Sequence, residues 1–350
     1  MNFEEVNSRT EIESVGEFGL IDLITEEVKV ENKSTVKGIG DDCAVLSYPK
    51  KKVLVSTDLL VEGVHFDMVY TPLKHLGYKS AVVNFSDIYA MNGKPKQIVV
   101  GLAISNRFSV EAIKELYSGL NLACKRYNVD LVGGDTTSSV SGLCISITVI
   151  GEGDEDRIAY RSGAKVNDLL CVTGNLGAAY MGLHILEREK QAWKGNPDVQ
   201  PDLTGYEYII QRFLKPEARF DVVEILKAKD VVPTSMIDIS DGLASELHHI
   251  CHDSNVGCRV YEDKIPIDPQ TLLTSEEFNF NPMTAAMNGG EDYELLFSIK
   301  QSDYEKIKDI PQISVIGHIT ENPKELYLIT NDSKAIDIKA QGWKHFSNNI

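Results

Sequence analysis

Residues 129–137 read Val-Asp-Leu-Val-Gly-Gly-Asp-Thr-Thr, a short apolar run that ends in two glycines, a carboxylate and two hydroxyls. Related acidic clusters lie beside apolar stretches at 38–43 (Gly-Ile-Gly-Asp-Asp-Cys), 53–58 (Val-Leu-Val-Ser-Thr-Asp) and 238–243 (Asp-Ile-Ser-Asp-Gly-Leu). Such a run predicts a buried strand that brings a carboxylate to its solvent end, where open α/β sheets bind ligands. One such ending is ordinary turn chemistry. Four in one chain predict carboxylates that converge on a strongly cationic partner.

The rest of the chain follows an α/β pattern on both sides of these runs. Short apolar runs with turn signals at their ends predict strands at 53–57, 97–105, 129–132, 143–151, 168–173, 236–239, 293–297 and 313–319. Longer periodic segments predict helices at 73–91, at 110–127 with Ser109 as N-cap, at 177–189, from Pro216 onward, and at 243–252. The predicted fold class is α/β.

Length and local composition indicate two domains. A chain of 350 residues is too long for one comfortable core. The charged, glycine-rich segment 151–156 is the best candidate for a linker, so we expect domains at 1–152 and 157–350. A polar stretch with two prolines at 190–205 predicts a loop.

Overall composition excludes several classes of function. The net charge of −17 argues against nucleic acid, because affinity for a phosphate backbone needs clustered Lys and Arg. A small phosphorylated ligand stays possible if divalent cations mediate its contact. No apolar run approaches the ~20 residues that span a bilayer, and the polar first residues predict no signal peptide. The six cysteines lack Cys-x-x-Cys spacing, which predicts reduced thiols in a cytoplasmic protein.

The predicted helix at 73–91 carries an unusual polar stripe. The helix is apolar almost all round, yet Ser80, Asn84 and Asp87 fall at positions i, i+4 and i+7. Long charged side chains would be expected on a solvent face, so this stripe predicts a wet or metal-bearing cavity. The alternative is a buried Asp87 whose hydrogen bonds lie within the helix or a loop.

The first two acidic clusters offer candidate metal ligands. Neighbouring side chains in a loop point in different directions, so only one of Asp41 and Asp42 is expected to bind an ion, and a plain turn is the alternative. Ser56, Thr57 and Asp58 provide the hard oxygen ligands that Mg²⁺ prefers. Taken alone, this second cluster is also what an ordinary strand end looks like.

The other two clusters are more specific. The glycines at 133–134 would let backbone N–H groups approach a phosphate, while Asp135 holds the accompanying cation. In the last cluster Asp238 is a candidate ligand, and Asp241 is a ligand or the N-cap of the next helix. Both clusters therefore fit a metal-bound phosphate.

Weaker signals carry little weight. Gly-Asn-Leu-Gly at 174–177 is explained equally well by close helix packing, and no P-loop occurs in the sequence. The run His-His-Ile-Cys-His at 248–252 matches no common zinc spacing and predicts a surface helix. A calcium-binding loop of the EF-hand type is also missing from the sequence.

In this order, the motifs resemble those of the thiamine-monophosphate kinase family, within the ATP-binding superfamily of aminoimidazole ribonucleotide synthetase and selenophosphate synthetase. The match runs from about residue 16 to residue 346. The motifs at 62–66 and 289–294 favour this kinase family over its relatives in the superfamily. The shared words are Gly16-Glu17-Phe18, Gly38-Ile39-Gly40-Asp41-Asp42-Cys43, Ser56-Thr57-Asp58, Glu62-Gly63-Val64-His65-Phe66, Asn84-Phe85-Ser86-Asp87, Gly133-Gly134-Asp135-Thr136-Thr137, Arg161-Ser162-Gly163-Ala164, Asp238-Ile239-Ser240-Asp241-Gly242 and Gly289-Gly290-Glu291-Asp292-Tyr293-Glu294.

The resemblance implies roles for individual residues. The implied magnesium ligands are Asp42, Ser56, Thr57, Asp58, Asp87, Asp135, Asp238 and Asp241. The implied ATP contacts are Tyr117, Gly134, Asp135, Arg161 and Ser240, with Arg161 and Asp135 as catalytic residues. The implied thiamine-phosphate contacts are His65, Glu291 and Trp343. An aromatic side chain at 343 would suit flat cationic rings, and a packing anchor at the C-terminus is the alternative.

The resemblance also implies a fold and a reaction. The fold is the two-domain, aminoimidazole ribonucleotide synthetase-like one, with mixed sheets flanked by helices in each domain. The N-terminal domain would bind ATP and Mg²⁺ and form a homodimer, and the C-terminal domain would complete the active site. The reaction moves the γ-phosphoryl of ATP onto the phosphate of thiamine monophosphate, with no nucleic-acid or membrane partner. The two polyanions carry roughly −6 together, so several Mg²⁺ ions are expected.

Two other functions compete with this one. The first is another ATP-dependent reaction of the same superfamily, on a formylglycinamidine or selenide-type substrate. The second is a non-catalytic protein that binds nucleotides or divalent cations. Loss of carboxylates from the acidic clusters would favour the non-catalytic protein, and no such carboxylate is missing from the shared motifs.

Overall fold

The computed structural model describes residues 10, 15, 20, 23–37, 45–198 and 200–340 of the chain. The chain divides into two compact units. The first comprises 1–84 and 95–152, and the second comprises 85–94 and 153–350. Within the described ranges, no helix is both long and apolar enough to cross a membrane.

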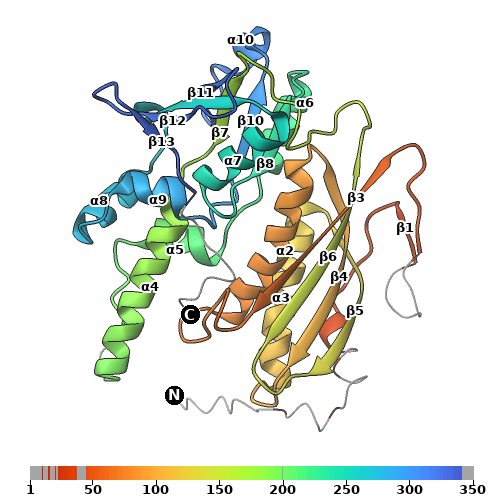
Figure 1. Cartoon of the computed structure of the whole chain (residues 1–350). Helices are drawn as coiled ribbons and strands as arrows, with labels where there is room; N and C mark the ends of the chain where they lie inside the picture. Colours follow the sequence, from red (N-terminus) through yellow and green to blue (C-terminus); the bar gives the residue numbers. More distant parts are fainter. Residues whose placement is uncertain are drawn as a thin grey trace. The chain divides into compact units, whose positions relative to one another are not determined.

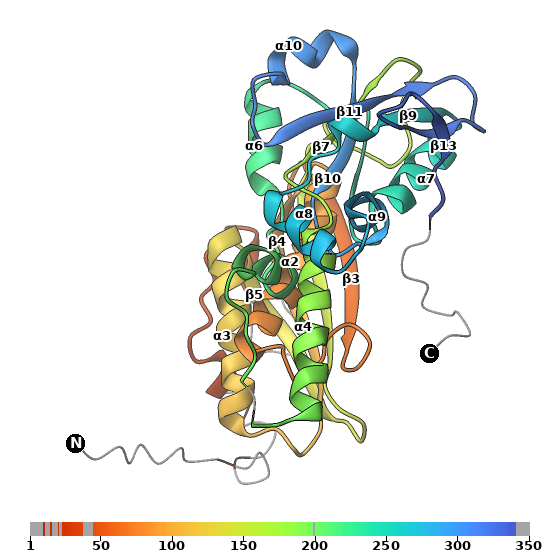
Figure 2. The same ribbon diagram turned by 90° about the vertical axis from the view of Figure 1, so that its left-hand side faces the viewer.

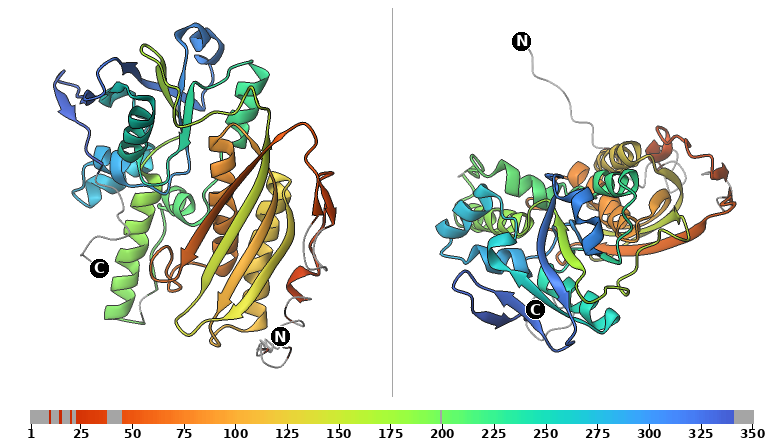
Figure 3. Two further views of the ribbon diagram at one scale, coloured as in Figure 1. Left: turned by 45° about the vertical axis from the view of Figure 1, so that its right-hand side comes forward. Right: turned by 90° about the horizontal axis from the view of Figure 1, so that it is seen from above.

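A four-stranded sheet with helices on one face organises the first unit (Figures 1 and 3). Its elements are β1 Thr35–Lys37, β2 Val45–Leu46, β3 Lys52–Val61, α2 Leu73–Ala90, β4 Lys94–Ile104, α3 Val110–Tyr127, β5 Asp130–Ser138 and β6 Cys144–Gly153. The large sheet has the order β3-β6-β4-β5, and β1 pairs with β2 in a separate ribbon. The central β4 pairs in parallel with β5, and an irregular register there places Val99 opposite Gly133.

Helices α2 and α3 approach each other closely because each contributes a glycine. A Cβ at Gly77 would lie 1.9 Å from the Leu116 carbonyl oxygen, and a Cβ at Gly119 would lie 1.9 Å from the Lys74 carbonyl oxygen. Only glycine permits such an approach. All residues from 76 to 86 are buried, which explains why α2 is apolar almost all round.

A seven-stranded mixed sheet organises the second unit. Its strands are β7 Leu169–Thr173, β8 Ser235–Asp238, β9 Gly257–Tyr261, β10 Leu295–Ile299, β11 Ile313–Thr320, β12 Leu326–Ile329 and β13 Ala335–Asp337. The order is β13-β12-β9-β11-β7-β10-β8. Neighbouring strands are antiparallel except β12 and β9, which pair in parallel. The central strands β7 and β10 are almost entirely buried, as their continuous apolar sequences require.

The helices of the second unit form two groups. They are α4 Ala178–Gly195, α5 Glu207–Leu214, α6 Phe220–Ala228, α7 Leu243–Ser254, α8 Pro269–Glu277, α9 Pro282–Asn288 and α10 Tyr304–Ile307, with short 3₁₀ turns η1 Glu262–Lys264 and η2 Gln301–Asp303. Leu243, Leu247 and Ile250 of α7 pack into the core of the sheet. Helix α4 packs on α5, α8 and α9 through a separate apolar cluster that includes Met181 and Ile209 (Figure 2).

Most elements agree with the sequence-based predictions. The eight predicted strands correspond to β3, β4, β5, β6, β7, β8, β10 and β11. The α/β class is confirmed, and so are α2, α7 and α3, whose N-cap Ser109 accepts a hydrogen bond from the Ala112 N–H. Close packing explains the glycines at 174–177, since a Cβ at Gly177 would lie 2.8 Å from the Ala285 backbone.

Three local predictions are wrong. The loop predicted from residue 190 begins too early, because α4 continues to Gly195. The helix is supported there by charged side chains one turn apart, such as Lys190 and Glu187, which pair at 3.0 Å. Pro216 does not start a helix; it lies between α5, which was not predicted, and α6. Strands β3 and β5 run four and six residues past their predicted ends, since a strand with one solvent face continues through polar residues.

Candidate functional site

The Ser-Thr-Asp cluster lies inside β3 rather than at its end. Side chains alternate along a strand. Ser56 and Asp58 share the face that also carries the buried Leu54, whereas Thr57 lies on the exposed face. The Thr57 hydroxyl donates to the Ile147 carbonyl at 3.0 Å. Any contact of Thr57 with an ion that Asp58 also binds would therefore come from its backbone.

The polar stripe of α2 does not line a wet cavity at Ser80 and Asn84, so that prediction is wrong for these two residues. Both are completely buried, at 0 % exposure. Ser80 donates to the Leu76 carbonyl at 2.7 Å, and the Asn84 amide donates to the Ser80 carbonyl at 3.0 Å. The Asn84 Oδ1 accepts from the Asp58 N–H at 3.1 Å. Asn84 therefore fixes the β3 backbone where the candidate ligand Asp58 lies.

Asp87 is the partly exposed end of the same stripe. It lies in the last turn of α2, which ends at Ala90 and carries no basic residue there. A carboxylate at this end faces the negative pole of the helix dipole, which disfavours it. A cation bound at Asp87 would remove that unfavourable interaction.

Asp135 lies in the exposed second half of β5. The strand has a buried first half and an exposed second half that begins after Gly133. A Cβ at Gly134 would lie 2.3 Å from the Val100 carbonyl oxygen, so close strand packing accounts for this glycine. Gly133 has open space around it and does not have that constraint. The carboxylate of Asp135 is thus presented to solvent by a rigid strand.

A tight turn after β3 holds His65. The Val61 N–H donates to His65 Nδ1 at 3.0 Å, and the His65 N–H donates to the Val61 carbonyl at 2.9 Å. Because Nδ1 accepts, the neutral ring carries its proton on Nε2. The turn is anchored by Glu62, whose carboxylate accepts from the Leu143 N–H at 2.9 Å and pairs with Arg107.

In the second unit, Asp238 ends β8 and is 6 % exposed. Its Oδ2 accepts a hydrogen bond from the Ser86 hydroxyl at 2.6 Å. Ser86 lies on the segment of α2 that belongs to this unit and precedes Asp87 in the sequence. Ser86 was not among the predicted site residues, because its partner Asp238 is far away along the chain.

Two motif loops are joined by backbone hydrogen bonds in the second unit. The Glu291 N–H donates to the Ser240 carbonyl at 2.7 Å, and the Tyr293 N–H donates to the Ile239 carbonyl at 2.9 Å. A Cβ at Gly290 would lie 2.5 Å from the Ser240 carbonyl oxygen. The candidate substrate residue Glu291 and the candidate ATP residue Ser240 are therefore neighbours.

Glu246 is an acidic neighbour that the sequence analysis missed. Asp241 is not the N-cap of α7, since Gly242 takes that position without a side-chain cap. Instead the Asp241 N–H donates to the Glu246 carboxylate at 3.2 Å. Burial raises the pKa of Glu246 to about 8, and the nearby Asp238 and Asp241 carboxylates add to this, while Arg161 opposes it. The only sequence signal for Glu246 was its place in the first turn of the helix that follows Asp241.

Arg161 is exposed and lies close enough to Glu246 to influence its charge. The segment after it is fixed by Ser254, whose hydroxyl accepts from the Gly163 and Ala164 N–H groups at 3.1 Å each. Gly163 has a φ of +119°, and a Cβ there would lie 2.5 Å from the Thr234 carbonyl oxygen. The motif thus holds its arginine on a backbone with little freedom.

Comparisons with known proteins follow the same two-part division. The model for AIR synthase related protein, N-terminal domain, matches residues 40–152, and that for AIR synthase related protein, C-terminal domain, matches residues 165–328. Thiamine-monophosphate kinase of Bacillus subtilis (strain 168) is 35% identical over 339 residues, which are 94% of this chain and 99% of the relative. The chain belongs to the thiamine-monophosphate kinase family.

Solved structures of kinases in this family are also similar. One described as AaThiL complexed with AMPPCP and TMP has a TM-score of 0.74 at 33% identity, and the alignment covers 98% of this chain and 100% of that chain. Thiamine-monophosphate kinase from Stenotrophomonas maltophilia K279a has a TM-score of 0.77 at 28% identity over 92% of this chain and 98% of that chain.

The remaining predicted site residues are Asp42, Trp343 and Tyr117. Asp42 and Trp343 lie outside the described residues. Tyr117 lies in α3 and is 5 % exposed, and burial raises the pKa of its phenol to about 12. Among the described residues, no group of three or more His, Cys, Asp or Glu side chains is arranged to hold a metal. The candidate ligands are distributed over both compact units.

Proposed function

We propose that this protein transfers the γ-phosphoryl group of ATP to the phosphate of thiamine monophosphate, which yields thiamine diphosphate. The observation that carries the proposal is the near-complete alignment with the kinase family at about one-third identity, including a solved relative described as complexed with AMPPCP and TMP. AMPPCP is an analogue of ATP. The nucleotide and acceptor of that relative are the two substrates proposed here.

Magnesium ions complete the proposed site. Carboxylate and hydroxyl oxygens are the donors that Mg²⁺ prefers, and this chain offers such donors at all the candidate positions. Bound Mg²⁺ would neutralise part of the charge on both substrates. The proposed ligands are Asp42, Ser56, Thr57, Asp58, Asp87, Asp135, Asp238 and Asp241.

The protein side chains position the substrates rather than activate a nucleophile. A phosphate monoester has its second pKa near ~6, so the acceptor is already ionised and needs no strong base. Arg161 would offer its guanidinium to the charge that develops during transfer, and the Gly134 and Ser240 segments would contact ATP. Catalysis then consists of alignment and charge neutralisation.

Thiamine monophosphate is assigned to His65 and Glu291, with Trp343 as a further contact. The neutral His65 ring has its donor on Nε2, which suits a phosphate oxygen. The Glu291 carboxylate, which accepts from the Tyr293 hydroxyl at 3.1 Å, suits the cationic ring of thiamine.

The same proposal makes the protein a cytoplasmic homodimer that associates through its first unit. The outer face of β3 exposes Val53, Val55 and Leu59 at 50 %, 65 % and 53 %, an apolar stripe that a second copy would cover. The described cysteines, all free thiols, support a reducing compartment.

A coupled assay for thiamine diphosphate tests the function. Purified protein is given ATP and thiamine monophosphate over a Mg²⁺ titration, and turnover that requires all three is expected. Parallel reactions contain formylglycinamidine ribonucleotide or selenide as acceptor. Turnover of one of these instead would favour the superfamily alternative, and nucleotide binding without any turnover would favour a non-catalytic protein.

A further inference from the structure

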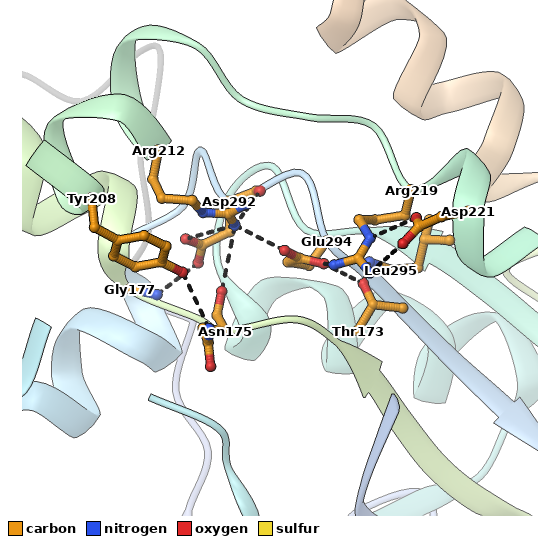
Figure 4. A network of polar contacts seen from close by, with 10 residues as sticks. All are labelled: Thr173, Asn175, Gly177, Tyr208, Arg212, Arg219, Asp221, Asp292, Glu294 and Leu295. Carbon is orange, nitrogen blue, oxygen red and sulfur yellow. Dashed lines mark hydrogen bonds and ion pairs between the residues drawn. The ribbon is translucent and has the colours of Figure 1, made fainter. Parts of the chain in front are cut away.

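A network of charged side chains connects the loop at 289–294 to α5 and to the start of α6 (Figure 4). Arg212 of α5 and Arg219, which precedes α6, converge on the Glu294 carboxylate. An Arg212 Nη lies 3.0 Å from Glu294 Oε1, and an Arg219 Nη lies 2.8 Å from Oε2. Arg219 also binds both carboxylate oxygens of Asp221, at 3.0 and 2.9 Å. Glu294 is 1 % exposed, so its two ion pairs are shielded from water, whereas Asp221 is partly exposed.

Arg212 also holds the backbone of the loop. Its Nη2 donates to the Asp292 carbonyl at 2.9 Å and to the Asn175 carbonyl at 3.4 Å. The Asp292 side chain is fully buried, and its Oδ2 accepts from the Gly177 N–H at the start of α4 at 2.8 Å. Arg212 thus contacts both the loop backbone and the Glu294 carboxylate. All of these contacts are made by one nitrogen, Nη2, so they depend on how far the arginine side chain reaches.

The loop requires this support because its backbone is disfavoured. Glu291 and Tyr293 have left-handed φ angles of 62° and 51°, which residues other than glycine rarely adopt. Their side chains meet each other, since the Tyr293 hydroxyl donates to Glu291. The intervening Asp292 and the following Glu294 are held in the network. Restraint of these two buried residues therefore determines where Glu291 points.

We propose that Arg212 is a positioning residue that, through Asp292 and Glu294, holds Glu291 in the orientation that binds thiamine monophosphate. This inference rests on the proposed function of the site. In this proposal Arg212 does more than stabilise the fold in general. Arg212 contributes to affinity for the acceptor through the geometry of one loop, and ATP affinity depends on it much less.

The decisive variant is Arg212→Lys, which keeps a positive charge beside Glu294 but, because lysine is shorter, withdraws the donor from the Asp292 carbonyl. Because misplacement by a fraction of an ångström weakens a binding contact, we expect KM for thiamine monophosphate to rise about tenfold while KM for ATP changes by less than about twofold. The matched control is Arg157→Lys in the same unit. Arg157 also contacts a carboxylate and a carbonyl, those of Asp230 and Val231, at 2.9 and 3.2 Å, but neither belongs to the loop.

A double-mutant cycle with Glu291→Gln separates positioning from stability. If Arg212 acts through Glu291, Arg212→Lys adds less than about twofold to KM for thiamine monophosphate once Glu291 is replaced. The inference would be overturned if Arg212→Lys raised KM for ATP as much as KM for thiamine monophosphate, or left KM for thiamine monophosphate unchanged. It would also be overturned if the double variant raised KM for thiamine monophosphate by the product of the two single-variant increases. If Arg212→Lys does not fold, Arg219→Lys is measured in the same way, and it must raise the acceptor KM selectively.

The outcome for the wild-type protein distinguishes the two proposals. If neither the wild type nor Arg157→Lys phosphorylates thiamine monophosphate, the proposed function fails. If both do so and Arg212→Lys behaves like them, only the positioning role of Arg212 is lost.

Discussion

Asp130 and Asp135 lie on the same strand, β5, in opposite environments. Asp130 is 1 % exposed and accepts hydrogen bonds from the Asn32 N–H at 3.1 Å and the Thr35 hydroxyl at 2.6 Å. Asp135 is exposed. A buried carboxylate that is satisfied by local donors supports the fold, whereas an exposed one on a rigid strand can bind a cation.

Asp135→Asn should abolish catalysis without damage to the fold. Loss of a charge that holds a catalytic cation is expected to lower kcat at least ~100-fold at saturating Mg²⁺, by analogy with other electrostatic contacts. The urea midpoint should remain that of the wild type. Asp130→Asn is the matched control, with the reverse pattern: a loss of about 1–3 kcal/mol of stability and nearly normal kcat in the folded protein. A normal kcat in Asp135→Asn would remove Asp135 from the metal site.

Asp292→Asn should alter how stability depends on pH. Burial raises the pKa of Asp292 to about 7, while Arg212 and the Gly177 N–H oppose the rise. Between pH 4 and 7 the folded state therefore holds a proton that the unfolded state has lost, and wild-type stability falls as pH rises through this window. The steepest slope for one proton is about 1.4 kcal/mol per pH unit.

In the Asn variant this contribution is absent, so its stability relative to the wild type should increase from pH 4 to 7 and then level off. Urea unfolding at several pH values provides the measurement. Asp263→Asn, at a position where the side chain is 61 % exposed, serves as the control and should run parallel to the wild type. A difference that stays constant with pH would contradict the role of Asp292.

At the scale of elements, the crossing of α2 and α3 positions the candidate ligands of the first unit. Gly77 and Gly119 let the helices touch, and Asn84 on α2 then reaches the β3 backbone at Asp58. A change in this crossing would move Asn84 away from the strand. Helix packing is therefore linked to the geometry of the site.

Gly119→Ala should destabilise the protein despite the better helix propensity of alanine. Its Cβ would lie 1.9 Å from the Lys74 carbonyl oxygen, so the helices must separate, and overpacking of this kind costs about 1–3 kcal/mol. Gly195→Ala at the end of α4 meets nothing within 4 Å and is the control, with stability unchanged or slightly higher. The midpoint of urea unfolding measures the stability of each variant. Equal midpoints for Gly119→Ala and Gly195→Ala would contradict the tight crossing of α2 and α3.

Sequence periodicity predicted the elements better than their ends. Apolar runs located β3 and β5, but their polar continuations, where Asp58 and Asp135 lie, belong to the strands as well. The apolar pattern that predicts a strand stops where the side chains become exposed to solvent, although the backbone pairing continues beyond that point. Helix α5 was missed because its eight residues are too few for a clear period.

At the scale of the molecule, the acidic motifs and their family could be recognised from sequence, whereas their supporting residues could not. Ser86 and Asp238 are 152 positions apart, and no local pattern connects them. Arg212 and Glu246 were missed for the same reason, since an arginine or glutamate on a helix is usually solvated. Their roles follow from burial and from partners that only the fold brings together.

The homodimer proposed above can be tested by charge on the outer face of β3. Val55→Lys should convert the dimer to monomers, because burial of an unpaired ammonium between two copies is unfavourable. Light scattering at several protein concentrations gives the mass. Val140→Lys, at a fully exposed position on the same unit, is the control and should remain dimeric. A dimeric Val55→Lys would move the interface elsewhere.

Helix α2 belongs to both compact units, with 73–84 in the first and 85–90 in the second. Its last turns make their contacts in the second unit, where Ser86 meets Asp238 and Tyr89 lies against Phe220. Gene segments cut after residue 152 would thus separate this peptide from Asp238 and Phe220, its partners in the second unit. Chimeras between members of the family should inherit residues 85–94 from the parent that supplies the C-terminal half.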